Sequence, residues 1–300
     1  NRTVFTPGPS SDGATGHPSV NQRQRVVDLA EGGTGLTMTE PLAVSEKGRL
    51  HPGTPGIYTD EHAEYWGESV DETGDAPVGA ELFHAGRRGA TRPRTRALDR
   101  PLDGDEAWEL LAPSADPYTK RNQTPTPMDD DDLATVREQF AAAATRADDA
   151  GFEVAEIHAA HGYLLHEFLS PVTNDRDDEY GGDFEGRSRL TREVTAAVRE
   201  AWPGDKPLFV RVSATDWLRD RESWTLESTI RLADRLADLG VDLIDVSGGG
   251  IHPKSRPPES GPGYQESYAQ EIRERTERDV RVGAVGGITT PEQADALVRN

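Results

Sequence analysis

The sequence predicts an α/β fold, specifically a (β/α)8 barrel of the TIM type that lacks its eighth β/α unit in this chain. Short apolar strands and amphipathic helices alternate seven times along the 300 residues, which favours parallel pairing of the strands. Distinctive residues directly follow the strand ends, and in a barrel those ends form one face: Pro7, Glu40, Glu81, His158, Arg211, Ser247 and Gly286. No strand is followed by G-x-G-x-x-G, so a doubly wound nucleotide-binding sheet is the weaker alternative.

Residue types that are typical of helix starts and helix ends mark the limits of the helices between these strands. Gly33 and Gly240 each follow a helical pattern, because glycine readily adopts the backbone that ends a helix. Four aspartates at 129–132 put negative charge at a helix N-terminus, and Pro291 suits a first helical turn. We therefore expect strands at 3–5, 36–40, 78–83, 154–157, 208–213, 243–246 and 282–285, and helices at 20–31, 60–72, 129–150, 185–201, 226–239, 264–277 and 291–299.

The organisation predicted from these elements is a single domain over residues 1–300. Seven β/α units leave two strand edges of a barrel unpaired, so we expect the chain to be a fragment truncated at both ends. Residues 84–127 are rich in Arg, Pro, Asp and Gly and show no sustained periodicity. Such a long segment indicates either a functional excursion or lid, or a solvated surface loop.

Composition narrows the class of protein. A formal charge of −21 argues against nucleic-acid binding, and no apolar run is long enough to span a membrane. With no cysteine, the chemistry must come from oxygen and nitrogen side chains or a bound organic cofactor. Without a membrane-length run or a basic and apolar N-terminal leader, we expect a soluble, cytoplasmic protein. The acidic composition with only four lysines predicts a halophilic source, and an acidic mesophilic protein is the alternative.

The stretch 153–182 carries the candidate catalytic residues His158, His161 and Tyr163. Two imidazoles three residues apart can converge on one substrate oxygen, and a phenol can supply a proton. Each histidine, taken alone, is also compatible with a structural core or turn residue whose ring nitrogens are hydrogen-bonded. The pair could instead supply two zinc ligands, but no third ligand is evident nearby, so we expect no metal.

The full run resembles the Old Yellow Enzyme family of FMN-dependent oxidoreductases, most closely its bacterial NADPH dehydrogenase and xenobiotic reductase branch. The resemblance is carried by H-A-A-H-G-Y-L-L-H-E-F-L-S-P at 158–171, followed by Asn174, Arg176, Asp178, Tyr180, Gly181 and Gly182. It implies a ping-pong reaction in which NADPH or NADH reduces FMN and an α,β-unsaturated carbonyl compound is then reduced. The implied partners are a small enone-like substrate and, in this branch, a second copy in a homo-oligomer.

The resemblance also implies roles for individual residues. His158 and His161 would bind the carbonyl oxygen, Tyr163 would protonate carbon, and Arg211 would stabilise the negative charge of reduced flavin. The remaining residues implied to bind the cofactor are Thr6, Pro7, Gly8, Pro41, Glu81, Ser247, Gly248, Gly286 and Gly287. Gly286 and Gly287 would lie at the phosphate, where glycine lets the backbone approach an anion.

Three positions depart from the family pattern. Pro9 stands where this branch has a cysteine, Ser11 where it has a tyrosine, and Glu81 where the family has a glutamine that reads the flavin. We expect Glu81 either to be protonated, so that it donates like an amide, or to turn away and pair with Arg211. Because of these departures, a relative that binds flavin or another ligand without turnover is one alternative. A metal-dependent barrel hydrolase is a further alternative.

Overall fold

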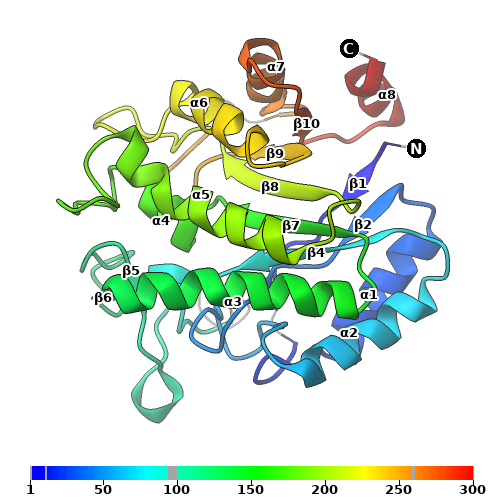
Figure 1. The fold of residues 1–300 in the computed structure, drawn as a ribbon, viewed down its shortest axis with the longest axis horizontal. Helices are drawn as coiled ribbons and strands as arrows, with labels where there is room; N and C mark the ends of the chain where they lie inside the picture. Colours follow the sequence, from blue (N-terminus) through cyan, green and yellow to red (C-terminus); the bar gives the residue numbers. More distant parts are fainter. Residues whose placement is uncertain (1, 11, 94–99, 258–260, 300) are drawn as a thin grey trace.

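The central feature of the computed structural model is a curved parallel sheet. The structure describes residues 2–10, 12–93, 100–257 and 261–299. Seven parallel strands follow one another in chain order and form an open half-barrel, which agrees with the predicted incomplete barrel (Figure 1). The strands are β1 (Val4–Phe5), β2 (Leu36–Met38), β4 (Val78–Phe83), β7 (Val154–Ala159), β8 (Leu208–Ser213), β9 (Leu243–Ser247) and β10 (Arg281–Ala284). A short strand, β3 (Leu42–Ala43), also pairs with β4.

Helices cover the outer face of this sheet (Figure 1). They are α1 (Val20–Glu31), α2 (Asp60–Glu72), α3 (Asp130–Asp149), α5 (Phe184–Ala201), α6 (Leu226–Ala237), α7 (Glu266–Arg275) and α8 (Pro291–Arg299). Side chains of Thr59, Asp129, Asp183 and Thr225 accept first-turn N–H groups, which satisfies donors that a helix start leaves free. Within the described ranges, no helix has the length and apolar character needed to cross a membrane.

The two faces of the strands differ in chemistry. Alternate residues on β7 and β8 that face the helices are apolar and buried, such as Ile157 and Val210, and they join one large hydrophobic core. The residues between them point to the concave inner face, because successive side chains of a strand alternate in direction. Strand pairing places Glu81 opposite Glu156, His158 opposite Arg211, and Arg211 opposite Asp245 on that face. The sheet therefore gathers charged groups inside the half-barrel.

The structure differs from the expected elements at several ends. The predicted helix at 264–277 begins later and ends earlier as α7, with Gln265 at its N-cap and Thr276, in an extended conformation, at its C-cap. A short helix that sequence patterning missed, α4 (Leu164–Leu169), follows the candidate catalytic residues. In the described parts of 84–127, namely 84–93 and 100–127, the elements are short: η1 (Gly86–Arg88), η2 (Gly104–Glu106), β5 (Leu111–Ala112) and β6 (Thr126–Pro127). The departure at Ser11 lies outside the described residues.

Candidate active site

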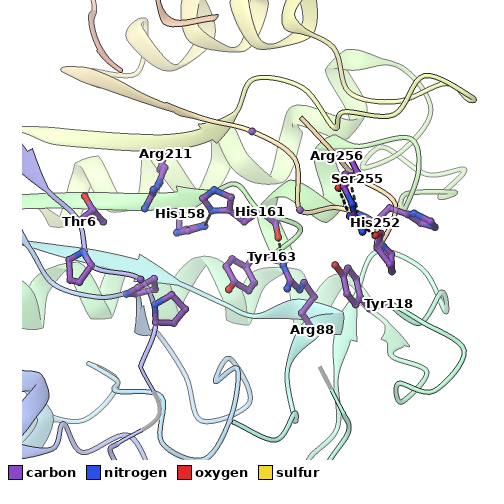
Figure 2. A pocket seen from close by; sticks show the side chains of 17 residues that line it. Thr6, Arg88, Tyr118, His158, His161, Tyr163, Arg211, His252, Ser255 and Arg256 are labelled. Carbon is purple, nitrogen blue, oxygen red and sulfur yellow. Dashed lines mark hydrogen bonds between the residues drawn. The ribbon is translucent and has the colours of Figure 1, made fainter. Parts of the chain in front are cut away.

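A cavity of about 380 Å3 lies at the carboxyl ends of the strands, and Figure 2 shows the side chains around it. Nine of the residues predicted to bind cofactor or substrate line it: Thr6, Pro7, Gly8, Pro41, His158, His161, Tyr163, Arg211 and Gly248. These come from segments far apart in the chain, and the parallel strands bring them together because their carboxyl ends share one edge. The volume falls in the range of small-molecule and cofactor sites.

His158 and His161 contact each other at the centre of this cavity. Nδ1 of His161 lies 3.0 Å from Nε2 of His158, and Nδ1 of His158 lies 2.5 Å from Oε1 of Glu81. Glu81 and His158 are both buried. Burial lowers the pKa of His158 in spite of Glu81, and burial together with Arg211 lowers the pKa of His161 well below its ordinary range. Both imidazoles are therefore neutral at neutral pH.

The turn that presents His161 has an uncommon backbone. His161 has φ 59° and Gly162 has φ 73°, both in the left-handed region. A Cβ on Gly162 would meet the carbonyl oxygen of Gly250 at 2.4 Å, so the loops after β7 and β9 can touch only with glycine there. The N–H of His161 donates to Ser213 Oγ at 3.0 Å, and Nη1 of Arg88 donates to the His161 carbonyl at 2.6 Å. Several contacts thus hold this strained turn in place.

Arg211 supplies a fixed cation at the inner face. Its Nη1 lies 3.2 Å from Oε1 of Glu81, and its Nε lies 3.1 Å from Oδ2 of Asp245. Burial would raise the pKa of Glu81, but His158 and Arg211 outweigh burial and hold that pKa below its ordinary value. Of the two arrangements expected for Glu81, the structure shows the carboxylate paired with Arg211, and it adds a contact with His158 that the sequence did not indicate.

Glu156 is a second buried carboxyl on the inner face. Burial, followed by the charges of Asp245 and Glu81, raises the pKa of Glu156 well above its ordinary value. Glu156 is therefore protonated at neutral pH while Glu81 beside it is ionised. The two carboxyls lie on paired strands but differ in protonation state, because Glu81 has His158 and Arg211 within contact distance.

Tyr163 lies in an aromatic and cationic part of the cavity. Its ring centroid is 5.0 Å from that of His158 and 5.2 Å from that of Phe83. The guanidinium of Arg88 lies 5.2 Å from the Tyr163 ring and 4.6 Å from the Tyr118 ring. Tyr163 itself is only 4% exposed, which shields its phenol from bulk water.

Four residues implied to bind the cofactor do not line this cavity: Glu81, Ser247, Gly286 and Gly287. Oε1 of Glu81 contacts His158 and Arg211, and Ser247 Oγ accepts from Nη2 of Arg211 at 3.4 Å. Gly286 and Gly287 follow β10 with φ of 107° and 69° and pack beside Gln265 and residue 261.

Besides Pro9, which the sequence marked only as a departure from the family pattern, seven lining residues were not predicted to belong to the site: Arg88, Tyr118, Gly250, His252, Pro253, Ser255 and Arg256. Arg88 and Tyr118 belong to the aperiodic segment 84–127, so the functional interpretation of that segment agrees with their position. The other five lie at the end of the glycine run after β9 or just beyond it, where no recognisable pattern marked them. Among the described residues there is no group of three or more His, Cys, Asp or Glu that could hold a metal ion.

Comparison with known proteins gives a consistent picture. The model of the NADH:flavin oxidoreductase / NADH oxidase family matches residues 11–300. The chain belongs to this family. As an Old Yellow Enzyme relative, it is 42% identical over 274 residues to the NADPH dehydrogenase of Geobacillus sp., a match that covers 90% of this chain and 74% of that protein. It is 40% identical over 278 residues to the NADPH dehydrogenase of Bacillus subtilis, covering 91% and 75%.

Solved structures support the same assignment of fold. The old yellow enzyme homologue from Zymomonas mobilis matches with a TM-score of 0.77 at 24% identity, covering 100% of this chain and 81% of that chain. A morphinone reductase mutant in complex with tetrahydroNAD matches with a TM-score of 0.76 at 25% identity, covering 100% and 80%. This Old Yellow Enzyme relative is therefore an NAD(P)H:flavin oxidoreductase with an incomplete barrel.

The residues present fit a flavin. Pro7, Pro9 and Pro41 contribute apolar side chains to the cavity lining, and Arg211 adds a fixed cation. Oε2 of Glu81 is buried without a hydrogen-bond partner in the described part of the chain. An N–H group of a bound ring system is the kind of donor that would satisfy this oxygen.

Proposed function

We propose that this oxidoreductase binds FMN and uses NADPH or NADH to reduce the activated C=C bond of α,β-unsaturated carbonyl compounds in a ping-pong sequence. The supporting observation is that His158, His161 and Tyr163 converge on one cavity that also contains Arg211. When bound, FMN would supply the hydride transfer, and the protein supplies orientation, charge and protons.

The cofactor would be held along the strand ends. We assign its binding to Thr6, Pro7, Gly8, Pro41, Arg211 and Gly248, which line the cavity, and to Glu81, Ser247, Gly286 and Gly287 beside it. Arg211 would stabilise negative charge, because a fixed buried cation needs no reorganisation when charge develops. Gly286 and Gly287 have backbone conformations that allow close approach of an anion.

The substrate would be held by the two histidines. His158 and His161 are positioned to hydrogen-bond a carbonyl oxygen, and such contacts strengthen as that oxygen gains negative charge. Tyr163 would donate the proton to carbon from a site that is shielded from bulk water. Their placement on a strand end and a strained, well-supported turn favours a fixed geometry for this chemistry.

The test is the colour of the purified protein. A yellow protein that bleaches with NADPH under anaerobic conditions and regains its colour with cyclohexenone would support the reductase. A yellow protein that does not bleach would instead indicate a binding protein, and a colourless protein with bound zinc would indicate a hydrolase.

Ligand binding tests the role of the histidines. His158→Ala and His161→Ala should each weaken the binding of a phenol by roughly tenfold to a hundredfold, the value of one lost hydrogen bond to a charged oxygen. His17→Ala, which removes a histidine that does not line the cavity, is the matched control. Unchanged phenol binding in both site variants would contradict the assignment.

A further inference from the structure

The contacts among Glu81, His158 and His161, here called the Glu81 trio, determine where the protons lie. An ionised carboxylate can only accept, so the proton between Glu81 and His158 belongs to Nδ1 of His158. A neutral imidazole carries a single N–H, and Nε2 of His158 must therefore accept. Nδ1 of His161 then donates to it across 3.0 Å. The same reasoning leaves Nε2 of His161 as a bare acceptor.

This arrangement leaves the trio without a donor for a ligand. Both imidazole N–H groups are already used, one toward Glu81 and one toward His158. A negatively charged ligand oxygen beside the two rings needs N–H groups, and it would meet lone pairs instead. One added proton resolves the conflict, because His158 can then donate at both nitrogens while His161 is released to offer its own N–H.

We propose that the Glu81 trio takes up one proton from solvent when an anionic oxygen, such as that of a phenolate or an enolate, binds beside the two imidazoles. The proton goes to Nε2 of His158, and the ionised Glu81 offsets the charge of the imidazolium that results. Glu81 is thus a positioning residue that sets the tautomer of His158. The inference rests on the proposed function, because it assumes that the histidines face the ligand oxygen.

Other titratable or charged groups face the trio from each neighbouring element, and they do not provide an equivalent proton site. They are Glu156 on β7, Arg211 on β8, Asp245 on β9, Arg88 on η1 and His166 on α4. Glu156 already holds its proton, as its raised pKa indicates. Asp245 contacts Nε of Arg211, and neither it nor Glu156 has a hydrogen bond to either imidazole among the described residues.

Calorimetric titration of the FMN-loaded protein tests this inference. The probe is 4-nitrophenol at a pH where it is fully ionised in solution, titrated in two buffers with different ionisation enthalpies. The trio should take up about one proton per bound ligand, and affinity should fall about tenfold per pH unit as pH rises. In Glu81→Gln the amide N–H can donate to Nδ1 of His158, so Nε2 already carries a proton. That variant should bind without proton uptake and with little pH dependence.

Glu156→Gln is the matched control, because it makes the same chemical change at a buried carboxyl on the neighbouring strand that is already neutral. It should behave like the wild type. If the wild type bound the probe without proton uptake, the inference would be overturned, and this result does not depend on whether Glu81→Gln folds. Undiminished proton uptake in Glu81→Gln would also overturn it. Loss of uptake in Glu156→Gln would also overturn it, by placing the proton elsewhere. If the wild type did not bind the probe at all, the proposed function would fail and the inference with it.

Discussion

Nε2 of His166 lies 2.9 Å from Oδ1 of Asp216, and both side chains are fully buried. Nδ1 of the same imidazole accepts the N–H of Gly162 at 2.9 Å, within the left-handed turn after β7. The other carboxylate oxygen of Asp216 accepts Oγ–H of Ser170 at 2.6 Å and N–H of Trp224 at 2.8 Å. This buried contact therefore ties the turn that carries the candidate catalytic residues to the loop after β8.

Replacing His166 should destabilise the protein strongly. His166→Phe would remove the ion contact at Oδ1 of Asp216 and leave the N–H of Gly162 buried without an acceptor, which should cost about 3–5 kcal/mol in the free energy of unfolding. Urea denaturation measures the change. Ser170→Ala is the graded control and should cost only about 1 kcal/mol, because Asp216 keeps its other contacts. Equal unfolding midpoints for His166→Phe and the wild type would show that this contact is not structural.

Tyr163→Phe should separate the two halves of the reaction. Reduction of the protein by NADPH should keep its rate, because that step needs no proton on carbon. The enone half-reaction should slow by roughly 10²- to 10⁴-fold if Tyr163 is the general acid. Stopped-flow spectroscopy follows each half separately. If both halves slowed equally, Tyr163 would position a ligand and solvent would supply the proton.

Much of the fold could be predicted because its signals are local. Helix stops such as Gly33 and Gly240, and the periodicity of strands such as 208–213, depend on neighbouring residues alone. Strand ends then predicted which side chains would share a face. The short helix α4 was missed because six residues, all buried, carry no amphipathic pattern.

The candidate site was predictable only where a recognisable motif marked it. His158, His161 and Tyr163 stood out through their spacing, and Arg211 through its position on a strand. Arg88 and Tyr118 lie in an aperiodic segment, so only tertiary packing places them beside Tyr163. The contact between His158 and Glu81 joins residues 77 positions apart, and no local pattern encodes the tautomer that it imposes.

Glu81→Gln should raise the midpoint potential of the bound flavin. In the wild type, Glu81 and Asp245 both contact Arg211 and offset its charge. Removing one carboxylate leaves more of the positive charge of Arg211 uncompensated, which favours binding of the electron-rich reduced cofactor over the oxidised one. Each tenfold change in the ratio of these two affinities corresponds to about 30 mV in midpoint potential. A redox titration of both proteins in high-salt buffer measures the shift. An unchanged midpoint with unchanged FMN affinity would show that Glu81 has no electrostatic effect on the cofactor.

Glu167 should make stability depend on pH in a direction opposite to that of most carboxyls. Its Oε1 accepts the N–H of Arg87 at 3.0 Å, while Oε2 is buried without a hydrogen-bond partner among the described residues. Burial outweighs the nearby Arg87 and raises the pKa of Glu167 to about 8 from an ordinary value of 4.5. Between these two values the folded state keeps a proton that the unfolded state releases. Stability should therefore fall as pH rises through this window.

Glu167→Gln should remove that dependence, because an amide cannot ionise and its oxygen can still accept from Arg87. The difference in unfolding free energy between Glu167→Gln and the wild type should shift in favour of the variant by roughly 3–5 kcal/mol from the lower to the upper end of this pH window. Each unit of pKa difference corresponds to about 1.4 kcal/mol. Urea denaturation at a series of pH values measures the difference. Glu138→Gln, at an exposed position on α3, should retain the wild-type slope. Parallel pH profiles for Glu167→Gln and the wild type would show that Glu167 is ionised in the folded protein, which would require a solvent path or a cationic partner at Oε2.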